Sequence, residues 1–232
     1  MDSIQKNAKV AGWLYLSLAL LAPFAIIYVP GKLIVRGNAT ATAQNILGHE
    51  TLFRVGILCE LLVTILFIFV VLALYRLLKA VDQKHAVLMA VLALVSVPIG
   101  LVTAVYNMAA LMILRGDDIL SVFEKSQLDS LAMMFLRLNS QGMVVAAIFW
   151  GLWLFPFGIL VIRSGFIPRV FGILLFFPGF AYLASSAIAV LLPEYSRTVS
   201  PFLMVLMMGE LPIVLWLVIK GARTAPAGTS AA

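Results

Sequence analysis

The sequence has little charge and few residues that bind metals or carry redox chemistry. Of its 232 residues, 11% are charged, one is a cysteine and two are histidines. A soluble domain carries about twice this charged fraction, because its surface must face water. The single Cys59 excludes an intramolecular disulfide and a cysteine-based metal cluster. Its place in an apolar run favours a buried packing role over a reactive thiol.

The standard catalytic and cofactor signatures are also missing. The sequence contains no HExxH, GxSxG, P-loop, dinucleotide-type glycine fingerprint or CxxC motif. His49 and His85 lie at the ends of apolar runs beside charged neighbours, so we interpret them as solvated or in contact with lipid headgroups. A proton-linked role for His49 is the alternative. We therefore expect no cofactor and no metal site, and the sequence leaves open whether the protein is an enzyme.

Apolar residues are abundant and occur in long runs. They make up 63% of the chain, whose mean hydropathy is +1.11. A helix needs about twenty apolar residues to cross a bilayer, and six runs meet this length. The sequence therefore predicts an all-α, polytopic membrane protein with a bundle of six transmembrane helices. The predicted spans are 10–29, 55–75, 86–114, a fourth that begins between 131 and 143 and ends at 162, 170–192 and 201–219.

The basic residues predict the orientation of the chain in the bilayer. They lie at the ends of the apolar runs rather than in a stripe, so the net charge of +6 does not indicate nucleic-acid binding. Lys and Arg are enriched in cytoplasmic loops, and alternate sides of the spans carry nine and five of them, which predicts that both termini are cytoplasmic. The expected partner is the lipid bilayer, and the oligomeric state is not predicted. The nine are Lys6, Lys9, Arg76, Lys79, Lys84, Arg163, Arg169, Lys220 and Arg223, and the five are Lys32, Arg36, Arg115, Lys125 and Arg197.

The chain is predicted to form one six-span domain over residues 1–222, followed by a disordered cytoplasmic tail at 223–232. Between the third and fourth spans, apolar residues recur at helical spacing over 119–130, with Phe123 and Leu128 among them. This pattern predicts an extra amphipathic outer helix, either lying on the surface or continuing the fourth span. Gly151 and Gly158 are seven residues apart, which places them on one helix face suited to close packing.

Several polar side chains fall inside or near the outer ends of the spans. Counting from Lys220 at about 1.5 Å per residue places Glu210 about ten residues in, near the bilayer midplane. The same count from Arg76 places Glu60 in the outer third. Charged residues inside spans normally face the bundle interior, so these residues define a candidate ligand-binding crevice that opens outwards. Its residues are Arg54, Glu60, Tyr106, Asn107, Arg137, Asn139, Gln141 and Glu210.

Helical angles suggest which of these groups could pair. Arg54 and Glu60 point in different directions on one helix, so we expect Glu60 to pair across helices, for example with Arg137. Glu210 is expected to meet polar atoms of other spans, with Glu60, Asn107 and Arg137 as the nearest candidates. Pro212 cannot donate to the carbonyl of Met208, so a freed carbonyl beside Glu210 is also expected.

Motifs along nearly the whole chain resemble a known family. They include "AGWLYL", "YVPGKLIV", "FRVGILCELL", "LYRLLKAVDQKHAVLM", "FLRLNSQG", "FWGLWLFPFGILVIRSGFIPRVFGILL" and "GELPIVLWLVIKG". These segments are similar to a bacterial family of six-span membrane proteins catalogued as domain of unknown function 4386. The resemblance implies a six-span protein of the bacterial inner membrane and implies no particular reaction.

Three functions are compatible with these features. The main hypothesis is that the protein binds or translocates a small or lipid-like ligand through the outward-facing crevice, with Glu210 as its floor. Arg54 and Arg137 would attract anionic groups, and Glu60 and Glu210 would bind a cation or exchange a proton. The alternatives are an intramembrane enzyme that acts on a lipid headgroup, and a structural or regulatory protein whose polar residues only tie helices together.

Overall fold

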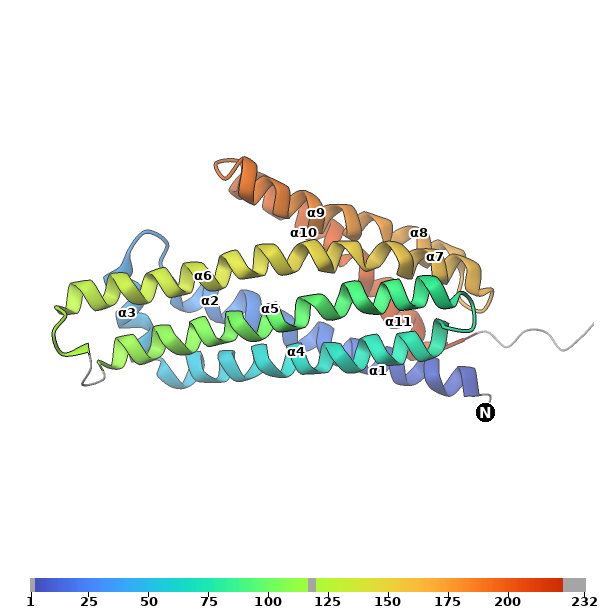
Figure 1. The fold of residues 1–232 in the computed structure, drawn as a ribbon, viewed down its shortest axis with the longest axis horizontal. Helices are drawn as coiled ribbons and strands as arrows, with labels where there is room; N and C mark the ends of the chain where they lie inside the picture. Colours follow the sequence, from blue (N-terminus) through green and yellow to red (C-terminus); the bar gives the residue numbers. More distant parts are fainter. Residues whose placement is uncertain (1–2, 117–119, 223–232) are drawn as a thin grey trace, which may run out of the picture. The chain divides into compact units, whose positions relative to one another are not determined.

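The computed structural model describes residues 3–116 and 120–222, and over these ranges the chain is 87% helical without any strand. Six helices are long and apolar enough to cross a membrane, which confirms the predicted class (Figure 1). The predicted tail at 223–232 lies outside the described residues. In chain order the helices are α1 (Ser3–Pro23), α2 (Val29–Leu33), α3 (Ala39–Gly48), α4 (Glu50–Leu78), α5 (Gln83–Arg115), α6 (Lys125–Leu152), α7 (Leu154–Ser164), α8 (Arg169–Leu174), α9 (Phe176–Leu191), α10 (Ser196–Met207) and α11 (Leu211–Ile219).

Several spans combine more than one helix. The first runs over Ser3–Leu33, because a π-helical turn at Phe24–Tyr28 follows Pro23 and joins α1 to α2. We expected this span to end at Pro30, but a proline is tolerated in the first turn of a helix, and α2 continues to Leu33. The remaining spans are Glu50–Leu78, Gln83–Arg115, Lys125–Ser164, Arg169–Leu191 and Ser196–Ile219.

The amphipathic segment before the fourth span is helical from Lys125 onwards and forms the first turns of α6. It therefore continues the fourth span, which is one of the two arrangements expected. Residues 121–123 form a turn and a bend, in which Phe123 is 45% exposed. Leu128 packs against a buried hydrophobic cluster, as expected.

The short helix α3 was not predicted. Asn38 caps its N-terminus, where Oδ1 accepts a hydrogen bond from the Ala41 backbone N–H at 2.9 Å. Asparagine is among the best residues at this position. The small residues of "ATATA" after Asn38 allow the helix to pack closely, and Ala43 and Ile46 are buried.

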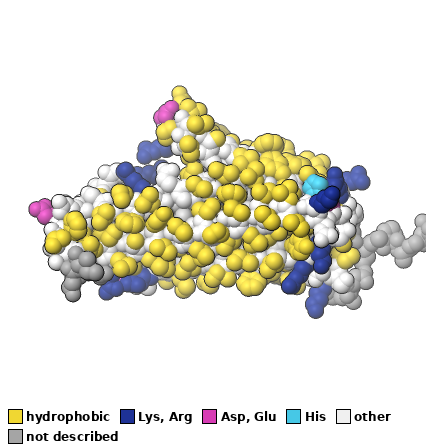
Figure 2. Space-filling model, viewed as in Figure 1, with side chains coloured by type: hydrophobic (Ala, Val, Ile, Leu, Met, Phe, Trp, Pro, Cys, Tyr) yellow, Lys and Arg dark blue, Asp and Glu magenta, His cyan; other side chains and the backbone are white. Residues whose placement is uncertain are grey.

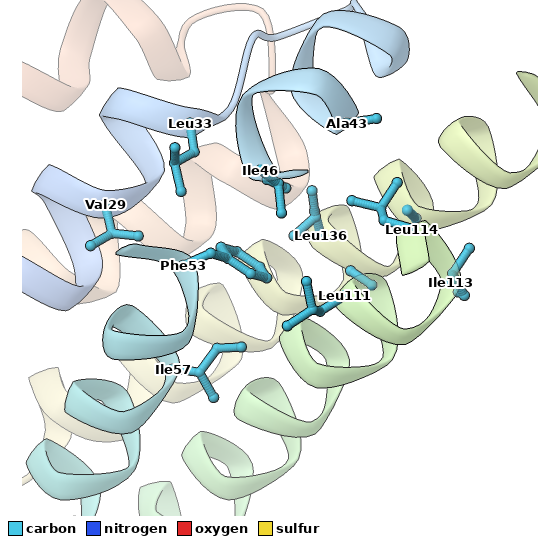
Figure 3. Close-up of a cluster of buried hydrophobic side chains, with 12 residues drawn as sticks. Val29, Leu33, Ala43, Ile46, Phe53, Ile57, Leu111, Ile113, Leu114 and Leu136 are labelled. Atoms are coloured by element: carbon cyan, nitrogen blue, oxygen red, sulfur yellow. The ribbon is translucent and has the colours of Figure 1, made fainter. Parts of the chain in front are cut away.

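The chain divides into two compact units. The described part of the first unit comprises residues 3–17, 67–96 and 147–222, and the second comprises Leu18–Leu66 and Val97–Ala146. The core of the second unit gathers apolar side chains from α2, α3, α4, α5 and α6. In Figure 3, Ile46, Phe53, Leu111 and Leu136 point towards one another.

The outer surface of the spans is apolar. Leu20, Leu191 and Val205 are 71%, 75% and 68% exposed. Figure 2 shows hydrophobic side chains over most of the visible face, with Lys and Arg side chains near helix ends. Each Å² of apolar surface left in water costs about 25 cal/mol, so this surface is suited to lipid hydrocarbon.

Glycines bring α7 into backbone contact with α8, and the end of α6 into contact with α9. A Cβ atom at Gly158 would lie 2.7 Å from the carbonyl oxygen of Gly172, and one at Gly151 would lie 2.7 Å from that of Gly179. The predicted close packing at Gly151 and Gly158 is therefore confirmed. Small residues at helix contacts are a general device of membrane bundles. In the same unit, α9 and α10 run antiparallel (orange in Figure 1).

Candidate functional site

The second unit contains a carboxylate held by neutral donors from two other helices. Glu60 on α4 accepts hydrogen bonds at Oε1 from Thr103 Oγ1 at 3.0 Å and from Asn139 Nδ2 at 3.1 Å. At Oε2 it accepts one from Asn107 Nδ2 at 2.8 Å. Thr103 is fully buried, and the other three residues are partly buried. We call these four residues the Glu60 cluster.

The helical repeat and two glycines explain how the Glu60 cluster forms. Thr103 and Asn107 are four residues apart on α5, so they lie on one face. A Cβ at Gly142 on α6 would lie 2.3 Å from Thr103 Cγ2, and one at Gly100 on α5 would lie 3.1 Å from Thr64 Oγ1. The absence of these two side chains lets α5 approach both α6 and α4 closely enough for direct hydrogen bonds.

Among the described residues, no basic side chain forms an ion pair with Glu60. The ion pairs found there involve only the carboxylates of Glu50 and Asp82. Asn139 Nδ2 also donates to the Thr103 carbonyl at 2.9 Å. In these hydrogen bonds Asn107 and Asn139 use the nitrogens of their amide groups. An amide that turns by half a rotation presents an oxygen instead of an NH₂ group, so the cluster can match a carboxylate, a carboxylic acid or a bound cation.

Other residues of the predicted crevice are placed differently. Arg54 Nε pairs with Glu50 Oε1 at 2.7 Å, one turn earlier on α4, and Arg115 lies 3.7 Å from the same oxygen. The expectation that Arg54 and Glu60 are poor partners is therefore confirmed. Arg137 and Gln141 on α6 are exposed. The suggested pair of Glu60 with Arg137 is wrong, because the amides of α5 and α6 occupy the carboxylate instead.

Tyr106 is partly buried, and its ring centroid lies 6.3 Å from that of Phe135. It is adjacent in sequence to Asn107 but packs against an aromatic ring of α6. Thr103, in contrast, was missed as a member of the site. Its spacing of four residues from Asn107 was the signal that could have identified it.

Glu210 lies in the first unit at a break in the sixth span. A 3₁₀ turn at Met208–Glu210 separates α10 from α11. The Glu210 carboxylate accepts hydrogen bonds from the hydroxyl groups of Tyr15 on α1 and Tyr182 on α9. The prediction that Glu210 meets polar atoms of other spans is confirmed. Its proposed partners Glu60, Asn107 and Arg137 are wrong, because tyrosines fill that role.

The expected free carbonyl beside Glu210 is also wrong. The Leu211 N–H donates to the Met208 carbonyl, which the 3₁₀ pattern makes possible by linking residues three apart. The proline therefore breaks the α-helical pattern without leaving this acceptor unpaired. Gly209 packs on α9 at the same break, since a Cβ there would lie 3.1 Å from Pro178 Cδ.

A third polar group lies at the ends of two spans, where the loop residue Asp82 contacts His85 and Arg163. Asp82 Oδ2 accepts from Arg163 Nη1 and lies near His85 Nδ1, both at 2.8 Å. The backbone N–H of His85, followed by its ring, holds the pKa of Asp82 below its usual range.

His49 Nδ1 lies 3.1 Å from the Asn45 carbonyl oxygen. Within the part of the chain that the structure describes, no group of three His, Cys, Asp or Glu side chains could hold a metal ion.

Six long apolar helices, an apolar outer surface and polar clusters between the helices define an integral membrane protein with several helical spans. The family model described as Domain of unknown function (DUF4386) matches residues 10–221. The chain therefore belongs to this family, as its motifs had indicated. No curated protein and no solved structure matches the chain.

Proposed function

We propose that the protein binds or translocates a small or lipid-like ligand at the Glu60 cluster, in a polar crevice that opens to the outer side of the membrane. One observation carries this proposal: the Glu60 carboxylate has three neutral donors and no basic partner among the described residues. Ionisable residues inside membrane spans are costly and usually mark ligand or ion pathways. The sequence places Glu60 in the outer third of its span.

The chemistry of the cluster suggests the kind of ligand. Glu60 contributes the only formal charge of the four residues, so the complementary group is a cation, an amine or a proton. Carboxylate, amide and hydroxyl oxygens are also the ligands that hard cations prefer. Arg54 is engaged with Glu50, which makes it a poor candidate for attracting an anionic group. Arg137 is exposed and stays a candidate for this role.

The three hydrogen bonds to the Glu60 carboxylate favour a second candidate function. Three hydrogen bonds from two other spans would also suit a purely structural tie between α4, α5 and α6. Such bonds contribute about 0.6 kcal/mol on average in membrane bundles. A structural tie predicts that replacing Glu60 changes stability alone, so a measurement of binding separates the two functions.

Native mass spectrometry of the full-length protein, extracted in mild detergent, tests the binding function. We expect a retained small molecule or lipid on the wild-type protein, because a carboxylate without a basic partner favours a bound counter-group. Glu60→Gln keeps the shape of the side chain but removes the charge, and it should lose the adduct. Glu50→Gln is the matched control on the same helix and should keep it. Equal retention by both variants would contradict the proposal.

We also propose that the protein lies in the bacterial inner membrane with both termini cytoplasmic. The support is the excess of Lys and Arg on one set of loops, which sets the orientation of spans. Reporter fusions to the tail after residue 222 and within residues 115–130 should report opposite compartments, with the tail inside. The same compartment at both positions, or a tail outside, would overturn this topology.

A further inference from the structure

The break in the sixth span is anchored to neighbouring helices of the first unit. Gly209 lies against α8 and α9, because a Cβ there would be 3.4 Å from the Leu174 carbonyl oxygen and 3.1 Å from Pro178 Cδ. Glu210 is the last residue of the 3₁₀ turn, and its side chain is partly buried. Any change in the hydrogen bonds of the Glu210 side chain therefore affects the junction between α10 and α11.

Two phenol groups from different spans face the Glu210 carboxylate. Tyr15 is 4% exposed, and its hydroxyl donates to Glu210 Oε2. Tyr182 contributes the second hydroxyl, from α9. The ring of each tyrosine packs against a tryptophan ring. The ring centroids of Tyr15 and Trp153 are 6.2 Å apart, and those of Tyr182 and Trp150 are 6.1 Å apart.

No basic side chain neutralises Glu210 within residues 3–116 and 120–222, where the ion pairs found involve other carboxylates. The titratable groups that face it are Tyr15 from α1 and Tyr182 from α9. On its own span, α11 contains no ionisable residue, and Arg197 and Lys220 are the nearest charged residues along the chain on either side. A carboxylate in an apolar interior without a cation is costly. A proton is the smallest species that can remove this charge.

We propose that Glu210 is a proton-binding site and that its protonation changes how the broken sixth span is tied to α1 and α9. The step is simple: one carboxylate oxygen accepts a proton from a hydronium ion, an O–H bond forms, and a water molecule remains. This proposal does not depend on whether the Glu60 cluster binds a ligand.

The two charge states differ in the number of donors. A carboxylate has only acceptors, so both tyrosine hydroxyls can donate to it. A carboxylic acid carries one donor of its own, which must point at an acceptor. The acid still accepts at its remaining lone pairs, but the oxygens nearest to its O–H are those of the two tyrosines, and a tyrosine that accepts this hydrogen bond turns its own proton elsewhere. Proton binding at Glu210 therefore rearranges hydrogen bonds that join three spans.

Infrared difference spectroscopy on the full-length protein in lipid nanodiscs, titrated from about pH 9 to about pH 5, tests the proposal. We expect acidification to produce a carboxylic acid band from an apolar environment, and Glu210→Gln should abolish it. Glu60→Gln removes a second carboxylate inside a span, and the band assigned to Glu210 should remain. Absence of the band in the wild type, its retention in Glu210→Gln or its loss in Glu60→Gln would overturn the proposal.

A second comparison does not require Glu210→Gln to fold. Tyr15→Phe and Tyr182→Phe each remove one donor, so each should shift the frequency of the Glu210 band, which follows its hydrogen bonding. Tyr28→Phe is the control, because Tyr28 is 55% exposed and its ring stacks on Phe24. An unchanged band in both Tyr15→Phe and Tyr182→Phe would show that the phenols do not hold Glu210.

Discussion

Replacing Gly172 with alanine is expected to lower the free energy of unfolding by about 1–3 kcal/mol, the usual cost of overpacking a well-packed contact. The added Cβ would lie 2.6 Å from the carbonyl oxygen of Gly158 and 3.0 Å from the backbone nitrogen of Ile162. Backbone atoms of a packed helix cannot move aside as the end of a flexible side chain can. The helices α7 and α8 must therefore separate, and unfolding in sodium dodecyl sulfate should measure the loss.

Gly31→Ala is the matched control for this prediction. Gly31 lies in α2 with no atom within 4 Å of an added Cβ. Alanine is a better helix former than glycine by about 1 kcal/mol, so this variant should be as stable as the wild type or slightly more stable. Equal stability of Gly31→Ala and Gly172→Ala would show that the contact between Gly158 and Gly172 is looser than described.

The spans were predictable because their signal is local. A run of about twenty apolar residues closed by charges needs no knowledge of neighbouring helices, and all six predicted spans are present. The face shared by Gly151 and Gly158 could be predicted in the same way, since helical spacing fixes which residues share a face. The helix α3 was missed because it is too short and too polar to resemble a span, although Asn38 and the small residues after it carry a capping signal.

The partners of the polar residues were harder to predict, because they depend on which helices are neighbours and on their relative rotation. Glu60 and Arg137 have opposite charges, yet Glu60 is bound by the amides of Asn107 and Asn139. Tyr15 lies 195 positions from Glu210 along the chain, and no spacing rule connects them. The pair of Glu50 with Arg54 could have been predicted from the sequence, because opposite charges four residues apart on a helix attract each other.

Water access to the Glu60 cluster is expected to differ sharply from that of the nearby core. Asn107 and Ala110 lie three residues apart on α5, but Asn107 contacts Glu60, whereas Ala110 is fully buried in the hydrophobic cluster of the second unit. The thiolate is the nucleophile that reacts with thiol reagents, and it forms readily only where water is present. A cysteine at position 107 should therefore react, and a cysteine at position 110 should not.

The most direct measurement of the proposed crevice is the reactivity of these two cysteines with a membrane-impermeant thiol reagent. Cys59 is the one cysteine of the sequence, so Cys59→Ala provides the background for Asn107→Cys and Ala110→Cys. With reagent added to the outer face of intact spheroplasts, the cysteine at position 107 should react at least about ten times faster than that at 110. If neither cysteine reacts until the protein is denatured, or if position 107 reacts only when the cytoplasmic face is exposed, the Glu60 cluster does not line an outward-facing crevice.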